Sequence, residues 1–237
     1  KPWTKDEVLQ RYYFTNPYRE NDKTTVWFRE NIREPMHDDP AVLMATVIFR
    51  WFNRIETGEA LLRTGLLRWW DEAKAIRVLR GLEPPIFTGA YMIKAGNGPP
   101  GCKVPNVCRS ISGVHAQHQR LVACCEQQRT LEALWQQLKG FPYLGGFMSY
   151  EIACDLRYTA LLEGATDVDT WANLGPGALR GLLRIRDKPL PMHDDGRINV
   201  SRIPDGVAAL RKLLHTVRSK LGQTMPRFEL REIEHSL

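Results

Sequence analysis

The sequence lacks any hydrophobic run near the roughly 18 residues needed to cross a bilayer, so no membrane span is expected. It also lacks a recognisable secretory signal, sustained strand-like alternation, internal repeats and long low-complexity segments. These absences predict a mainly α-helical protein of the cytoplasm. With 237 residues, 43% of them hydrophobic and 25% charged, the chain can bury a sizeable core, and we expect a single helical domain over residues 1–237.

Cysteine is scarce: there are five, and an odd number without a secretion signal indicates reduced thiols. Cys102 and Cys108 precede His115 and His118, but this spacing matches no standard zinc finger, so no metal site is expected. The stretch 96–103 lacks the Gly-Lys-Ser/Thr ending and the preceding strand of a P-loop. The sequence therefore predicts no bound cofactor.

Positive charge exceeds negative charge. The net charge is +6, the pI is about 9.1, and most of the 33 basic residues are Arg. Arg makes planar, bidentate contacts with phosphate groups and base edges. Nucleic acid is therefore a reasonable partner.

Caps and prolines divide the chain into expected helices. Thr4 is an N-cap candidate, Pro35 ends a helix, and Asp39-Pro40 begins the next one. Helices are expected over residues 4–12, 25–33, 41–62, 66–81, 115–138, 174–186 and 203–221. The run over 41–62 is apolar almost all round and predicts a buried central helix, whereas the Gly- and Pro-rich stretch 81–106 predicts a loop.

Two polar cassettes, FTNPYRENDKTTVWFREN and FRWFNRIET, each place Arg and Asn three residues apart. The pairs are Asn16 with Arg19 and Arg50 with Asn53. On a helix such residues share a face, and a guanidinium beside a carboxamide suits an anion and a base edge. We predict that these four residues bind substrate. The alternative is that they form salt bridges or a satisfied polar network in the core.

The stretch LKGFPYLGGFMSYEIACDLRYT, residues 138–159, has the pattern of a helix end, a glycine turn and a new helix. Gly145 and Gly146 let backbone amides approach an anion, and the new helix adds its N-terminus. The pattern predicts a helix-hairpin-helix element that grips a DNA phosphate without reading sequence. Lys139 and Arg180 are further candidate DNA-binding residues.

About twenty residues further on, Val168-Asp169-Thr170 resembles the step that bears the catalytic aspartate in the helix-hairpin-helix DNA glycosylase superfamily. This resemblance implies a glycosylase-like helical architecture. Phe147 stands where the bifunctional members carry a nucleophilic lysine, so lyase chemistry is not expected. The alternative is an ordinary helical turn with an N-capping aspartate.

A second resemblance spans nearly the whole chain. The segments WTKDEVLQRYYFTNPYRENDKTT, FRWFNRIET, GAYMI, LGGFMSYEIACDLRYT, GPGALRGL and LREIEHSL resemble the α-glutamyl/putrescinyl thymine pyrophosphorylase group. That group includes the helical domain of 5-hydroxymethyluracil DNA kinases and the amino acid:DNA transferases of bacteriophages. The resemblance implies a protein of a phage-infected host that acts on phosphorylated 5-hydroxymethyluracil in DNA. It also implies three partners: DNA with modified thymine, a small amino acid or amine, and a separate P-loop DNA kinase.

The resemblance further implies a transfer reaction on a base that has been flipped out of the duplex. Tyr18 would stack on the base, Asn16 and Asn53 would read its edge, and Arg19 and Arg50 would hold the phosphate. A carboxylate would accept the amine's proton as the phosphate leaves. The candidate catalytic carboxylates are Asp169, Asp167, Glu151 and Asp155.

Three functions are consistent with these residues. The first, and our leading hypothesis, is a transferase that replaces the phosphate on the base with an amino acid or amine. The second is a non-catalytic DNA-binding module of a 5-hydroxymethyluracil DNA kinase. The third is a glycosylase for a modified pyrimidine. An Asp169→Asn change is expected to abolish the first and third activities and to spare DNA binding in the second.

Overall fold

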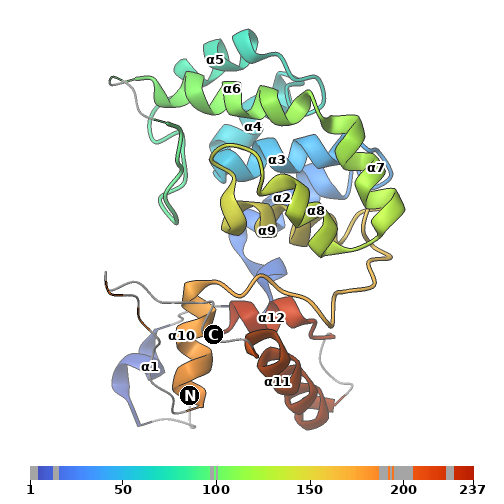
Figure 1. Cartoon of the computed structure of the whole chain (residues 1–237). Helices are drawn as coiled ribbons and strands as arrows, with labels where there is room; N and C mark the ends of the chain where they lie inside the picture. Colours follow the sequence, from blue (N-terminus) through green and yellow to red (C-terminus); the bar gives the residue numbers. More distant parts are fainter. Residues whose placement is uncertain are drawn as a thin grey trace. The chain divides into compact units, whose positions relative to one another are not determined.

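The computed structural model describes residues 5–12, 16–96, 99, 101–186, 192, 194, 205–222 and 227–237, apart from the side chain of Leu9. Within these residues the regular secondary structure is helical, with no β-strand (Figure 1). The prediction of a mainly α fold is confirmed.

The chain divides into two compact units. We call Val26–Asn173 the core unit, and Lys1–Thr25 together with Leu174–Leu237 the terminal unit. The terminal unit therefore combines the N-terminal and the C-terminal segments of the chain, which are separated in sequence by the whole core unit. The single domain expected from the sequence stays a prediction.

The core unit is built on one fully buried helix, α3, whose residues from Val42 to Phe52 are all buried. This helix packs against α9, α6 and α7, which places it in the middle of the unit (Figure 1). Helix α2 Lys23–Phe28 crosses the boundary between the two units. The core unit then contains, in order, the π-helical turn η2 Arg29–Arg33, α3 Val42–Phe52, α4 Ile55–Arg63, α5 Glu72–Arg80, α6 Lys103–His115, α7 His118–Gln128, α8 Leu131–Leu138 and α9 Gly145–Leu156.

The long central helix expected over residues 41–62 breaks after Phe52. Asn53 adopts a left-handed conformation, with φ 44° and ψ 47°, and Arg54 is extended before α4 begins. Asn tolerates this conformation better than most residues, because its short polar side chain bonds locally. The expectation of one continuous helix was therefore wrong.

The helix expected over residues 115–138 is also interrupted. Arg129 has a positive φ of 50°, and the Thr130 side chain then accepts a hydrogen bond from the Ala133 N–H at the start of α8. The helix expected over residues 66–81 begins only after Asp71, whose side chain caps α5 by accepting from Lys74 N–H at 2.7 Å. The first turn of α6 lies in the stretch that the sequence predicted to be a loop.

The terminal unit contains α1 Glu7–Arg11, the short 3-10 helix η1 Arg19–Asn21, α10 Pro176–Ile185, α11 Gly206–Leu221 and α12 Leu230–His235. The helices expected over 174–186 and 203–221 are present as α10 and α11; residues 203 and 204 lie outside the described residues, as does residue 4 of the first expected helix. Helix α12 was not predicted. A capping box formed by Glu229 and Glu232 begins it.

Candidate functional site

Arg50 and Asp155 form a bidentate ion pair inside the core unit. The Arg50 Nε and Nη2 donate to the two carboxylate oxygens of Asp155, with the Nη2–Oδ1 distance at 2.7 Å. The side chains are 1% and 0% exposed, so water does not screen the pair. The pair joins α3 to α9 across 105 residues of sequence. We therefore assign both residues to the core of the unit rather than to a ligand.

Asn53 belongs to the same buried network. Its side-chain oxygen accepts a hydrogen bond from Arg50 Nη1 at 2.8 Å. The Arg50 carbonyl in turn accepts from the hydroxyl of Tyr91 at 3.0 Å. The Arg50–Asn53 couple is thus formed as its spacing predicts, but its polar groups are directed at each other and at Asp155. This is the satisfied core network that the sequence left open as an alternative.

Asp167 lies beside the start of α8. Its two carboxylate oxygens accept hydrogen bonds from the backbone N–H groups of Leu131 at 2.8 Å and Glu132 at 2.9 Å. A carboxylate at this position satisfies two unpaired donors of the helix and interacts favourably with its dipole. Asp167 therefore stabilises α8, which is the capping alternative stated for this segment.

The other two candidate carboxylates also belong to the core unit. Glu151 is buried on α9, and Asp169 is half-buried in the turn that follows Asp167. Asp169 is thus the most accessible of the four candidates, since Asp155 and Asp167 are also buried. Its role as a catalytic residue stays a prediction.

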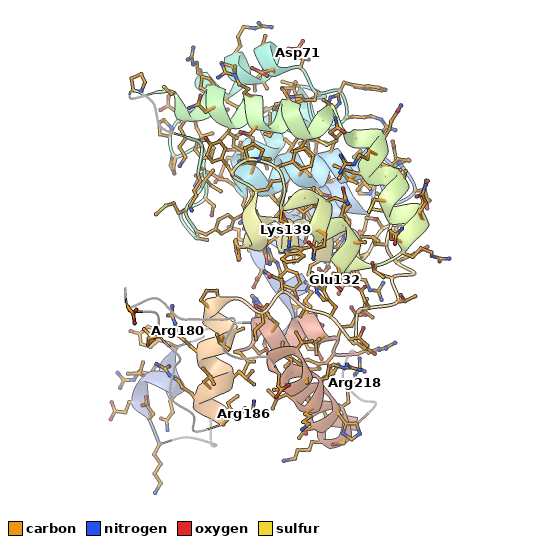
Figure 2. All side chains as sticks on the ribbon, in the orientation of Figure 1. Asp71, Glu132, Lys139, Arg180, Arg186 and Arg218 are labelled. Atoms are coloured by element: carbon orange, nitrogen blue, oxygen red, sulfur yellow. The ribbon has the colours of Figure 1, made fainter. Side chains whose placement is uncertain are left out.

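The turn between α8 and α9 has the expected helix, glycine turn and helix. Gly145 begins α9 with φ 58°, and a Cβ at that position would meet no atom within 4 Å. The Gly146 carbonyl accepts from Trp135 Nε1 at 2.9 Å, which ties the first turn of α9 to α8. Lys139 lies over the Trp135 ring, 3.9 Å from its centroid, and is labelled near this turn in Figure 2. Phe147 is 51% exposed.

The Asn16–Arg19 couple of the first polar cassette belongs to the terminal unit, whereas the end of that cassette, residues 26–31, belongs to the core unit. Asn16 precedes η1 and donates to Asp22 Oδ1 at 2.7 Å, which closes the loop that contains Tyr18 and Arg19. The ring of Tyr18 packs against Phe228, with centroids 4.7 Å apart. The two Arg–Asn couples are therefore not members of one unit, and neither Arg19 nor Asn16 shares a unit with Asp169.

The same loop packs against α12, over a separation of 211 residues between Glu20 and Arg231. Arg231 Nη2 lies 3.4 Å from Glu20 Oε1, and Arg231 Nε lies 3.4 Å from Glu232 Oε1. The last two residues of α12 are Glu234 and His235, both half-buried and both electrostatic neighbours of Arg19. The spacing of residues in the sequence did not identify Glu234 and His235 as candidate site residues. The only sequence signal that included them was the resemblance of the LREIEHSL segment to the family.

Burial shifts the titration of both groups. It raises the pKa of Glu234 to about 7, although the Gly175 N–H, Arg19 and Arg231 act in the opposite direction. Burial also lowers the pKa of His235, and the positive charge of Arg19 lowers it further. Both side chains therefore have substantial neutral populations near pH 7.

The terminal unit also carries a basic surface. Residues 176–186 and 206–221, which form α10 with its C-cap and α11, contain seven Lys and Arg residues and no Asp or Glu. Six of the seven are exposed, and Figure 2 labels Arg180 and Arg186 along α10 and Arg218 on α11. The basic residues are Arg180, Arg184, Arg186, Arg211, Lys212, Arg218 and Lys220. Since the whole chain has a net charge of +6, the remainder is slightly acidic.

The thiols provide no further candidate centre. Burial raises the pKa of Cys108 and of Cys125 to about 12, so both stay protonated at neutral pH. Among the described residues no group of three or more His, Cys, Asp or Glu side chains is arranged to hold a metal ion. Across the same part of the chain, every helix is too short or too polar to traverse a bilayer.

Residues 1–237 match the family described as "5-hmdU DNA kinase, helical domain". The chain belongs to this family. It is also similar to the "5-hmdU DNA kinase" of Bacillus phage SP10, with 29% identity over 201 residues that cover 77% of this chain and 32% of the relative. The chain thus spans about a third of the length of the curated relative that it matches. No solved structure matches it.

The family match covers both units, so the whole chain corresponds to the helical part of such proteins. The expected resemblance to the helical domain of 5-hydroxymethyluracil DNA kinases is confirmed. The wider pyrophosphorylase group and the helix-hairpin-helix glycosylases are not among the matches, and these two resemblances stay predictions.

Proposed function

We propose that this chain is the DNA-holding helical domain of a protein that modifies 5-hydroxymethyluracil in DNA, and that the terminal unit binds the phosphate backbone through α10 and α11. The observation that carries the proposal is the concentration of seven basic residues, six of them exposed, without a single acidic one on two neighbouring helices and the C-cap of the first. Such a surface attracts a polyanion independently of base sequence. The choice of 5-hydroxymethyluracil as the modified base follows from membership of the family.

The predominance of Arg on α10 favours phosphate as the group that is bound. Arg180, Arg184 and Arg186 present planar guanidinium groups, which form paired hydrogen bonds with phosphate oxygens. Contacts of this kind fix the position of a protein on DNA but carry no sequence information. The base itself must then be recognised at a different place on the protein.

The turn between α8 and α9 is a second proposed contact with DNA. Gly145 leaves open space in front of the first turn of α9, where unpaired N–H groups favour an anion. Lys139 adds positive charge at the same turn, and the exposed Phe147 offers an aromatic face. This arrangement supports the helix-hairpin-helix interpretation, in which the turn holds one phosphate.

The test of the proposal is a titration of duplex DNA by fluorescence anisotropy at several salt concentrations. The triple variant Arg180→Gln, Arg184→Gln and Lys212→Gln is expected to bind DNA at least tenfold more weakly at low salt. It should also reduce the slope of log affinity against log salt by about 0.9 for each phosphate contact that is lost.

A matched control removes the same charge from the core unit. Arg63, Arg77 and Arg80 are exposed on α4 and α5, and their replacement by Gln lowers the net charge equally. We expect this variant to bind DNA within about twofold of the wild type. Equal losses in the two variants would mean that only the net charge matters, and the assignment to α10 and α11 would fail.

The second candidate function is the transferase, in which an amino acid or amine displaces phosphate from the modified base. One observation favours it: two residues predicted to bind substrate, Tyr18 and Arg19, lie in the same cluster as Glu234 and His235. Incubation of the protein with phosphomethyluracil DNA and amino acids, followed by mass analysis of nucleosides, separates the candidates. A new adduct supports transfer, an abasic site supports a glycosylase, and unchanged DNA supports the DNA-holding domain.

A further inference from the structure

Three large hydrophobic side chains of the core unit are exposed where the loop between α5 and α6 meets the turn between α8 and α9. Met92 is 83% exposed, Phe147 is 51% exposed and Tyr143 is 46% exposed. In the described part of the core unit, the other large hydrophobic side chains that are exposed are Leu62 and Trp69. Isolated exposed hydrophobic residues are common on soluble proteins, but a group of them marks an interaction surface. We call Met92, Tyr143 and Phe147 the apolar patch.

Two contacts join the loop to the turn. The rings of Tyr91 and Phe147 meet edge to face, with their centroids 5.1 Å apart and their planes inclined by 70°. In addition, the Tyr143 hydroxyl lies so close to Gly96 that a Cβ added at this glycine would be 2.7 Å from it. The patch is therefore formed by tertiary contacts and not by one local segment.

The loop is also fixed to the core beneath the patch. The hydroxyl of Tyr91 donates to the carbonyl of Arg50 at 3.0 Å, which ties the loop to α3. Ile93 is buried, whereas Met92 and Lys94 on either side of it are exposed. Successive side chains of such a segment point to opposite sides. The buried Ile93 thus anchors the segment while Met92 and Lys94 face outward.

The surroundings of the patch are positively charged. Residues 86–96 and 139–150, which contain the patch, include Lys94 and Lys139 but no Asp or Glu. Both lysines are exposed. Gly145 leaves open space at the first turn of α9, where unpaired N–H groups favour an anion. The surface therefore suits a partner that carries both negative charge and flat apolar faces.

Tyr143 holds its ring in this surface at a conformational cost. Its φ is 66°, a value that is unfavourable for a bulky residue and that glycine adopts freely. A glycine at this position would relieve the cost and remove the ring. The variant Tyr143→Gly therefore separates the contribution of the ring to binding from its contribution to folding.

We propose that the apolar patch stacks on unpaired bases of a DNA strand, while Lys94, Lys139 and the first turn of α9 contact the phosphates of that strand. Phosphates and bases alternate along a strand, as cations and apolar side chains do on this surface. Stacking on a side chain needs an uncovered base face, and in paired DNA the neighbouring base pairs cover these faces. The choice of DNA as the partner rests on the proposed function, but the preference for unpaired bases does not follow from it.

The experiment measures fluorescence anisotropy of the full chain with two labelled duplexes, one fully paired and one with an internal run of unpaired thymines. The wild type should bind the second at least about fivefold more tightly. Phe147→Ala and Tyr143→Gly should each remove most of this preference, and each should change the affinity for the paired duplex by less than about twofold. Phe147→Leu keeps an apolar side chain without a flat ring and should also lose the preference, whereas Phe147→Trp should retain it.

Trp69→Ala is the matched control, because Trp69 is an exposed aromatic residue of the same unit outside the patch. It should keep the preference of the wild type, and circular dichroism shows whether each variant is folded. If the wild type binds both duplexes equally, or if Phe147→Ala and Tyr143→Gly retain the preference, base stacking by the patch is refuted. In the second case a protein becomes the better partner for the patch.

The same measurement keeps this inference separate from DNA binding by α10 and α11. The triple variant Arg180→Gln, Arg184→Gln and Lys212→Gln should weaken binding of both duplexes and leave their ratio unchanged. A triple variant that binds both duplexes like the wild type would overturn the role of α10 and α11. It would not affect the conclusion about the patch, which depends on the ratio alone.

Discussion

Removal of the negative charge of Asp155 should destabilise the core unit severely. The change Asp155→Asn preserves the size of the side chain but leaves the guanidinium of Arg50, 1% exposed, without its counter-ion. The carboxamide of the variant can still accept a hydrogen bond through its one oxygen, whereas the native carboxylate accepts two from Arg50. The variant therefore contains a buried charge that neither water nor a carboxylate compensates.

The expected loss follows from the burial of the pair. Breaking a buried ion pair by removing one partner costs about 3–5 kcal/mol. A domain of ordinary stability has about 5–15 kcal/mol in total, so this loss is a large share of the stability of the core unit. The double variant Arg50→Met with Asp155→Leu removes both charges, and it should lose much less than Asp155→Asn.

Urea denaturation followed by tryptophan fluorescence measures this effect. Six of the seven tryptophans belong to the core unit, so the signal reports mainly on that unit. Trp51 is buried on α3, next in sequence to Arg50. The control is Glu56→Gln, which breaks the partly exposed ion pair between Arg54 and Glu56, and it should change the free energy of unfolding by less than about 1 kcal/mol.

A loss below about 1 kcal/mol for Asp155→Asn, equal to that of the control, would refute the reasoning. It would mean that Arg50 is not held by Asp155 in the folded protein. Both residues would then be available to a ligand, and the original assignment of Asp155 to catalysis and Arg50 to phosphate would stand again.

Three further predictions concern stability. Gly58→Ala should lower the free energy of unfolding by about 1–3 kcal/mol, because its Cβ would lie 2.6 Å from the Trp27 ring. Gly113→Ala in α6 would meet no atom within 4 Å and should raise the free energy of unfolding by up to about 1 kcal/mol, and urea denaturation compares the two variants. Asp167→Ala should cost about 1–2 kcal/mol and increase amide exchange at the start of α8. Burial raises the pKa of Glu234 to about 7 in the folded protein, so the folded terminal unit binds more protons than the unfolded chain, and its stability should fall as the pH rises from about 4.5 to about 7. Thermal unfolding at each pH should show a smaller fall in Glu234→Gln, which retains only the contribution of groups such as Glu232, whose pKa burial also raises.

Much of the helical pattern was available from local sequence signals. Pro176 at the first turn of α10 and the apolar run around α3 both predict the helices that form there. The breaks were harder to predict, because Asn53 and Arg129 leave the helix by adopting left-handed conformations that depend on tertiary contacts. Helix α12 has only six residues and was missed although a capping box begins it.

The site residues were predicted less well than the helices, for a different reason. Spacing arguments compare residues three or four apart, but the partners that decide the role of a side chain come from distant segments. Asp155 is 105 residues from Arg50, and Arg231 is 211 residues from Glu20. The sequence therefore identified polar residues with a definite role, but it did not reveal whether a partner in the protein or a ligand satisfies them.

Arg19 and Arg50 illustrate how surroundings separate these two outcomes. Each begins as an arginine three residues from an asparagine, and each has a carboxyl group nearby. Arg50 meets Asp155 where both are inaccessible, so the charges satisfy each other and the pair stabilises the fold. Arg19 lies beside Glu234 where both are half-buried and the carboxyl is only partly ionised at neutral pH. The same three-residue spacing of Arg and Asn therefore occurs once in a buried structural pair of the core unit and once in a half-buried part of the terminal unit, and only the tertiary surroundings distinguish the two arginines.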